Sequence, residues 1–188
     1  EMGADVIKIE PPEGDSGRRI GPFYRNQAEP EKSLYWLAFN IGKRGITLNL
    51  RCRDGREILK KLVKGAQFLI ESFHPGYMND LGLGYNELKR INPSLVMTSI
   101  TPFGQTGPHK DYLASDLISM SMGGLVYLTG DVDRPPVRVS FPQAYLHGGL
   151  EGATGSLMAH FWSQRTGQGQ HVDVSITGSI HMVGTYPH

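Results

Sequence analysis

The sequence has a single cysteine, Cys52, among its 188 residues. One thiol excludes an intrachain disulfide framework and is typical of a protein from a reducing compartment. The sequence also lacks any uninterrupted apolar run near the ~20 residues that a membrane-spanning helix needs. Together these absences predict a soluble, cytoplasmic protein that does not act at a membrane.

The charge is balanced, with 19 Lys and Arg residues against 18 Asp and Glu residues, and no block of like charge is present. This balance argues against the basic surface of a nucleic-acid-binding protein and against a polybasic membrane anchor. The 7 histidines show no H-x-x-x-H or H-E-x-x-H spacing, which would be typical of a metal site. We therefore expect no nucleic acid, no membrane and no metal among the binding partners.

Short glycine motifs are present but incomplete. Residues 82–85 and 104–107 resemble parts of nucleotide-binding loops, yet neither completes G-x-G-x-x-G at a strand-to-helix junction. Ser72, Ser115 and Ser140 all lie outside a G-x-S-x-G motif. The sequence thus indicates neither a dinucleotide site nor a serine hydrolase.

Strand-like and helix-like patterns alternate along the chain. They predict strands over residues 6–10, 35–39, 46–50, 67–71, 95–100 and 172–174, and helices over 54–64, 86–91, 115–126 and 146–163. This alternation predicts an α/β fold in which a parallel sheet is flanked by helices, and the length fits one domain. Residues 1–3 are typical of a helix end with Gly3 as the C-cap, which predicts that an earlier βα unit is missing.

Several phrases occur in a fixed order over the whole chain: GADVIKIEPP at 3–12, ESFHPG at 71–76, FGQTGP at 103–108 and TGQGQHVDV at 166–174. In this order they resemble class III coenzyme A transferases, the CaiB/BaiF type that includes formyl-CoA transferase. The resemblance implies a Rossmann-like large domain and two chains that interlock as a dimer. Residues 1–188 match the N-terminal part of that large domain, without its first strand and without the small domain.

The resemblance also suggests a ligand site. The residues that it implies for coenzyme A binding are Arg18, Leu48, Asn49, Leu50, Arg51, Ser72, Phe73 and His74. Coenzyme A presents phosphates and an adenine face, which guanidinium groups, backbone N–H groups and apolar or aromatic side chains recognise. We expect coenzyme A and acyl-CoA as substrates rather than as a permanently bound cofactor. Asp80 and Leu113 stand where family members carry arginine and lysine, which predicts weaker phosphate binding.

The catalytic position differs from the family pattern. By resemblance, Tyr145 stands where the family keeps the aspartate whose carboxylate attacks the acyl-CoA thioester. A phenol with an ordinary pKa near 10 is protonated at neutral pH and cannot easily replace that carboxylate. Glu151 is the nearest carboxylate and a weak substitute. Ser115 stands at the histidine position of the racemase branch, so both members of that acid/base pair are missing.

Three functions remain open at this point. The chain is a subunit of a heteromeric CoA-transferase whose paralogous partner carries the aspartate, or a homomeric transferase with another nucleophile, or a CoA-thioester binding protein without turnover. The first hypothesis is favoured. In each transferase reading, coenzyme A moves between an acyl-CoA thioester and a carboxylic acid, and the residues name neither the donor nor the acceptor.

Overall fold

The computed structural model describes residues 3–184. The chain forms two compact units, Glu1–Leu59 and Lys60–His188, and each is described by itself. Of the helix end predicted at residues 1–3, only Gly3 is described, with a positive φ of 88°. Among the described residues, every strand pairing is parallel, as the sequence predicts.

In the first unit, β1 (Ile7–Glu10) pairs with β2 (Arg44–Thr47). Helix α1 (Leu34–Asn40) lies between them in sequence, so the strand predicted over residues 35–39 is wrong. The Ser33 side chain accepts a hydrogen bond from the Trp36 N–H at 3.1 Å and thereby caps the helix. Large aromatic residues favour strands, but here the cap and the burial of Trp36 decide the local structure.

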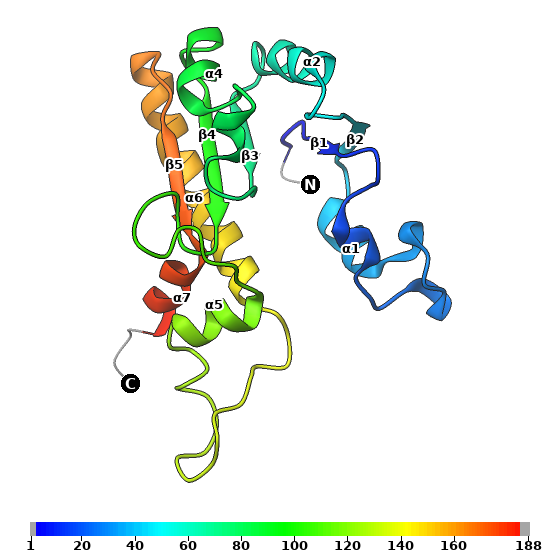
Figure 1. Cartoon of the computed structure of the whole chain (residues 1–188), viewed down its shortest axis with the longest axis vertical. Coiled ribbons are helices and arrows are strands. Elements are labelled where there is room, and N and C mark those ends of the chain that lie inside the picture. The colour runs from blue at the N-terminus through cyan, green and yellow to red at the C-terminus, as the bar shows by residue number, and fades with distance from the viewer. Residues whose placement is uncertain (1–2, 185–188) are drawn as a thin grey trace. The chain divides into compact units, whose positions relative to one another are not determined.

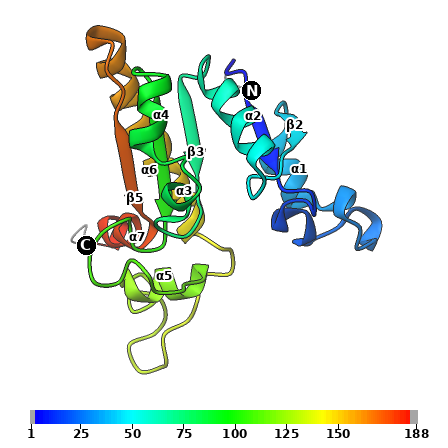
Figure 2. The same cartoon turned by 45° about the horizontal axis from the view of Figure 1, so that its top comes forward.

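In the second unit, the sheet has the order β3-β4-β5, formed by Phe68–Glu71, Val96–Thr101 and His171–Ser175. Helices α3 (Tyr77–Asp80) and α4 (Tyr85–Ile91) lie on one face of this sheet, and α6 (Ala144–Thr166) lies on the other (Figure 1 and Figure 2). The central strand β4 is almost fully buried. Helix α2 (Arg53–Val63) precedes the sheet and matches its prediction within one residue.

Helix α6 approaches the sheet closely because it presents glycines to the sheet. A Cβ added at Gly152 would lie 2.7 Å from Ile100 Cδ1, so a larger side chain there would push the helix away from β4. Beside this contact, the hydroxyls of Thr98 and Ser156 form a buried hydrogen bond of 2.7 Å. The Gly- and Ala-rich segment predicted as a helix is therefore the element that covers this face of the sheet.

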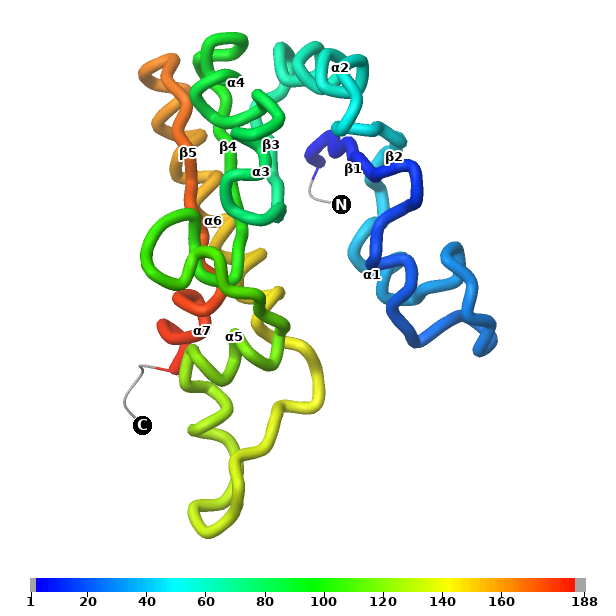
Figure 3. The backbone as a smooth tube through the Cα atoms, in the orientation of Figure 1, coloured from blue at the N-terminus to red at the C-terminus, as the bar shows by residue number. Residues whose placement is uncertain are grey.

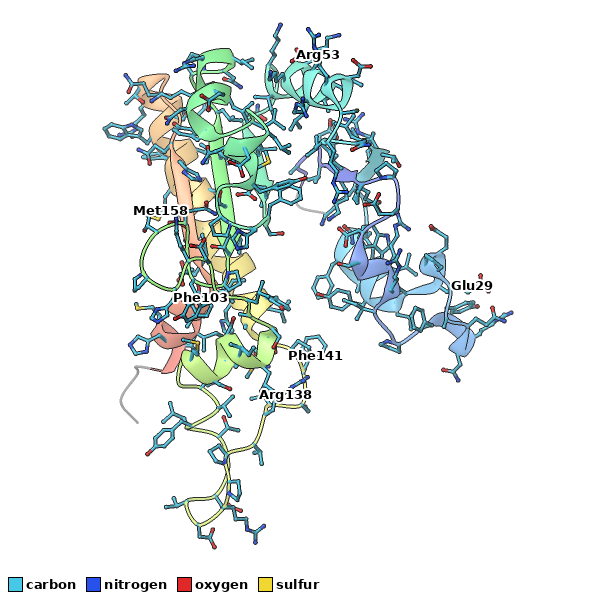
Figure 4. The ribbon with its side chains drawn as sticks, viewed as in Figure 1. Glu29, Arg53, Phe103, Arg138, Phe141 and Met158 are labelled. Atoms are coloured by element: carbon cyan, nitrogen blue, oxygen red, sulfur yellow. The ribbon has the colours of Figure 1, made fainter. Side chains whose placement is uncertain are left out.

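Helix α5 (Asp116–Met122) ends earlier than predicted, since Gly124 adopts a φ of 90° that a continuing helix does not allow. A long irregular segment then leads to α6, as the tube in Figure 3 shows. Arg138 and Phe141 lie on this segment, near its entry into α6 (Figure 4). Helix α7 (Ile176–Gly184) was not predicted; its Ile180 packs in a buried cluster with Met120 of α5.

Among residues 3–184, no helix combines the length and the apolar character needed to cross a membrane.

Candidate functional site

Arg18 is held by carboxylates and an aromatic ring in the first unit. Its Nε and Nη2 donate to the two carboxylate oxygens of Glu10 at 2.6 and 2.8 Å, and its Nη1 donates to Glu31 at 2.8 Å. The guanidinium also lies over Trp36, 4.3 Å from the ring centroid. The bonds from Arg18 hold the pKa of Glu10 below its usual range. The guanidinium is thus fixed in position, and two of its five N–H groups have no bond to these carboxylates.

The predicted segment Leu48–Arg51 follows β2 directly. The Leu48 N–H donates to the Glu10 carbonyl oxygen at 2.8 Å, so Glu10 holds both the guanidinium of Arg18 and the start of this segment. Asn49 Oδ1 accepts a hydrogen bond from the Arg51 N–H at 2.9 Å, which closes a tight turn. Leu48 is buried, whereas Asn49 and Arg51 are exposed. The structure therefore brings these predicted residues of the first unit together.

Close packing against helix α2 fixes this turn. Arg56 Nη1 donates to the Arg51 carbonyl oxygen at 2.9 Å. A Cβ added at Gly55 would lie only 1.9 Å from the Asn49 carbonyl oxygen. Only glycine permits this approach, because 1.9 Å is far inside van der Waals contact.

The predicted residues Ser72, Phe73 and His74 follow β3 in the second unit and are all exposed. The Phe73 N–H donates to Glu71 Oε2 at 2.7 Å, and the Phe73 ring lies 4.9 Å from that of Tyr77. His74 Nδ1 lies 3.1 Å from the Pro75 carbonyl oxygen. This loop presents an aromatic ring at the surface, as a platform for an adenine base requires.

Behind this loop is a polar network that the sequence reasoning missed. It lines a small cavity of about 20 Å³ and includes Glu71, Ser99 and His171. Burial raises the pKa of Glu71, against the opposing effects of hydrogen bonds from Ser99 and from the Phe73 N–H. The only sequence signal is that Glu71 and Ser99 lie at or near the end of a predicted strand, while His171 directly precedes another.

Tyr145 lies in the first turn of α6 and is 46% exposed. The residue before α6, Gln143, makes no side-chain cap; instead Asp116 Oδ1 accepts the Ala144 N–H at 2.8 Å. Ser115 caps α5 through the Ile118 N–H at 3.4 Å. Ser115 precedes Asp116 in the chain, and Tyr145 follows Ala144. The hydrogen bond between Asp116 and Ala144 therefore brings positions 115 and 145 close together.

Asp116 was not predicted as part of the site. An acidic residue in the first turn of a helix is a common helix-start signal, and Asp116 fits that pattern in α5. The sequence does not show that Asp116 also caps α6, whose Ala144 lies 28 residues further along the chain. Asp116 is only 8% exposed. A buried carboxylate oxygen on a backbone N–H fixes the place where α6 begins, and with it the position of Tyr145.

Glu151 lies further along α6 and lines a separate pocket of about 180 Å³, together with His147 of α6 and Ser179 of α7. Tyr145 does not line this pocket. Six residues of an α-helix turn the side-chain direction by about 120° from the starting side. Glu151 therefore lies on a different side of α6 from Tyr145.

Asp80 and Leu113 are the two positions where the resemblance predicts a loss of a positively charged residue. Both are exposed: Asp80 lies at the end of α3, and Leu113 is 86% exposed. Among the described residues, no group of three or more His, Cys, Asp or Glu side chains could hold a metal ion.

Comparison with known proteins defines the class. Residues 1–187 match the family model of CoA-transferase family III. The chain belongs to CoA-transferase family III, as the ordered phrases predict. It shares a TM-score of 0.89 and 39% identity with the crystal structure of a CAIB/BAIF family protein from Brucella suis, over 97% of this chain and 48% of that one.

Two named relatives also match this chain over more than 90% of its length. The chain is 48% identical over 174 residues to the subunit BbsE of succinyl-CoA:(R)-benzylsuccinate CoA-transferase from Thauera aromatica, covering 93% of this chain and 42% of that protein. It is 38% identical over 183 residues to the beta subunit of succinyl-CoA–L-malate CoA-transferase from Chloroflexus aurantiacus, covering 96% of this chain and 44% of that protein. The chain spans less than half the length of these relatives.

Proposed function

We propose that this chain is part of a CoA-transferase subunit that works in a heteromeric enzyme whose partner subunit carries the catalytic aspartate. The residue that carries the proposal is Tyr145: by the resemblance, it stands where the family keeps its aspartate, in a chain that otherwise matches the family. The names of two relatives, which describe subunits of heteromeric transferases, support it. The enzyme moves coenzyme A from an acyl-CoA thioester to a carboxylic acid, and coenzyme A is a substrate rather than a resident cofactor.

Two segments are proposed to bind coenzyme A, one in each unit: Arg18 with Leu48–Arg51 in the first unit, and the loop Ser72–His74 in the second. The N–H groups of Arg18 that the carboxylates leave unbound suit a phosphate, since guanidinium–phosphate hydrogen bonds are strong and directional. The Phe73 ring, 42% exposed, suits the face of a base. The exposed Asn49 and Arg51 suit the polar edge of the ligand.

Tyr145 explains why a partner is required. The family's carboxylate attacks the thioester carbon, forms a mixed anhydride and expels the coenzyme A thiolate. A phenol hydroxyl would have to lose its proton first, and it would give an aryl ester, which is a different intermediate. A protonated phenol is a poor substitute for that carboxylate at neutral pH, so we propose that the aspartate comes from another subunit.

The surface of α6 supports assembly with a second subunit. Five of its large apolar residues are more than half exposed: Leu150 at 65%, Leu157 at 64%, Met158 at 70%, Phe161 at 62% and Trp162 at 53%. A contiguous apolar surface of this kind is typical of a protein interface. We propose a homodimer or a heterodimer with a paralogous subunit as the assembly, and the cytoplasm as its location.

The test uses the full-length protein, alone and mixed with its paralogous subunit. Transfer of coenzyme A from succinyl-CoA to a panel of carboxylic acids is followed by chromatography with mass detection. We expect transfer from the mixture only. Transfer by this chain alone, at the rate of the mixture, would overturn the heteromeric proposal.

Hydroxylamine trapping separates the alternatives. A trapped acyl group on Glu151 or Tyr145 would favour the homomeric transferase with another nucleophile. Tight coenzyme A binding without transfer in any mixture would favour a CoA-thioester binding protein. The variant Tyr145→Asp is expected to gain transfer activity alone, because it restores a carboxylate at the start of α6.

A further inference from the structure

Glu71 connects the buried sheet to the exposed loop Ser72–His74. It is the last residue of β3, and its Oε2 accepts the Phe73 N–H at 2.7 Å. In the parallel register, Glu71 lies beside Ser99 of β4, and Ser99 lies beside Asp173 of β5. Neighbours in register project to the same face of a sheet, so these side chains share the face that α3 and α4 cover.

A chain of hydrogen bonds ends on the Glu71 carboxylate. The Ser99 hydroxyl hydrogen-bonds to Glu71, and Ser99 Oγ lies 2.9 Å from His171 Nε2. A hydroxyl has only one hydrogen to donate. When Ser99 donates to Glu71, His171 Nε2–H donates to Ser99, and the His171 ring is itself stacked on Tyr85 at 5.5 Å.

This arrangement carries a stability cost at neutral pH. Burial raises the pKa of Glu71, and the charge of Asp173 adds to that effect. Because the folded state binds this proton more tightly than the unfolded chain does, the stability from Glu71 is present at acid pH and is lost as the pH rises through the folded pKa. The other titratable groups that face Glu71 are His171 of β5, Tyr85 of α4 and His74 of the loop.

We propose that Glu71 is a positioning residue for coenzyme A: its carboxylate, oriented by Ser99 and His171, fixes the backbone of Phe73 so that the exposed ring meets the ligand. The inference rests on the proposed function, because it takes Ser72–His74 as part of the coenzyme A site. A side chain that costs stability yet holds a surface loop in one conformation is typical of a functional requirement.

The experiment compares the full-length protein with its Glu71→Gln, Glu71→Ala and Glu87→Gln variants. Glu87 is the matched control, since it carries the same charge on α4, where its Oε1 lies 3.9 Å from Arg90 Nη1. Coenzyme A affinity is measured by calorimetry and Tm by thermal unfolding, both from pH 5.5 to 8.5. Exchange of the Phe73 amide with deuterium reports whether the loop is held.

We expect Glu71→Ala to weaken coenzyme A binding by about tenfold, the equivalent of one charge-assisted hydrogen bond of about 1.4 kcal/mol. Glu71→Gln keeps an acceptor for the Phe73 N–H but not the charge, so it should weaken binding by a few-fold while its Tm at pH 8 equals or exceeds that of the wild type. Amide exchange at Phe73 should accelerate in both variants, and Glu87→Gln should change none of these values. A purely structural role would instead lower the affinity and Tm together.

Wild-type affinity in Glu71→Gln and Glu71→Ala would overturn the positioning role and leave the proposed function intact. A parallel fall of affinity and Tm in Glu71→Gln would overturn it as well. Absence of coenzyme A binding by the wild type, alone and with its partner, would overturn both proposals. Binding that depends on Glu71 without any transfer of coenzyme A would uphold the positioning role and reject the transferase.

Discussion

Replacing Glu31 by Gln is expected to tighten coenzyme A binding. Glu31 occupies Nη1 of Arg18 at 2.8 Å, but its side chain is 82% exposed, whereas the opposing Glu10 side chain is only 8% exposed. A phosphate that approaches Arg18 from solvent must compete with Glu31 and also meets its negative charge. The buried pair with Glu10 would keep the guanidinium in place after Glu31 has lost its charge.

The size of the effect follows from the exposure of the pair. Exposed ion pairs contribute about 0.2–1 kcal/mol, so removing this competitor should raise the affinity for coenzyme A by about 1.4- to fivefold. The matched control is Glu29→Gln, which removes the same charge from a residue that pairs with Lys32 instead of Arg18.

Calorimetric titration with coenzyme A at low salt measures the effect, which should shrink as salt is added. An equal gain in Glu29→Gln would show that only the overall charge matters. Unchanged or weaker binding in Glu31→Gln alone would refute the assignment of Arg18 to a phosphate.

Three further predictions concern stability. Gly55→Ala should lower the free energy of unfolding by about 1–3 kcal/mol and weaken coenzyme A binding, because its Cβ would lie 1.9 Å from the Asn49 carbonyl oxygen; urea unfolding and calorimetry check both. Gly152→Val should lower Tm because its Cβ would lie 2.7 Å from Ile100 Cδ1, while the more open Gly149→Val should not. The lowered pKa of Glu10 contributes stability that is present above its unfolded pKa and is lost as the pH falls through the folded pKa; the acid loss of stability should be smaller in Glu10→Gln, as urea unfolding between pH 3 and 7 would show.

The sequence predicted the fold class because periodicity and turn residues act locally. Helix α2 and strand β4 match their predictions within a residue, since each has a clear apolar pattern and a clear boundary. The strand predicted over residues 35–39 failed because Tyr35, Trp36 and Phe39 are residue types that favour strands, yet the spacing of Tyr35 and Phe39 also places them on one side of a helix. The Ser33 cap and the burial of Trp36 against Gly17 then favoured the helix.

Some residues of the candidate site could likewise be predicted from the sequence, and others could not. Arg18 and Leu48–Arg51 could be named from the ordered phrases, and the structure joins them through Glu10. No local pattern singles out Asp116, because its hydrogen bond to Ala144 reaches across 28 residues.

The amino-acid sequence by itself determined the family, the parallel α/β class and the tyrosine at position 145, since each depends on residue identity and local order. Only the tertiary structure decided that Asp116 sets the start of α6 and that Glu71 holds Phe73 from a network reaching His171. Those contacts depend on which strands lie side by side and on how deeply a carboxylate is buried. Both are set by the packing of segments far apart in the chain, and no local pattern encodes them.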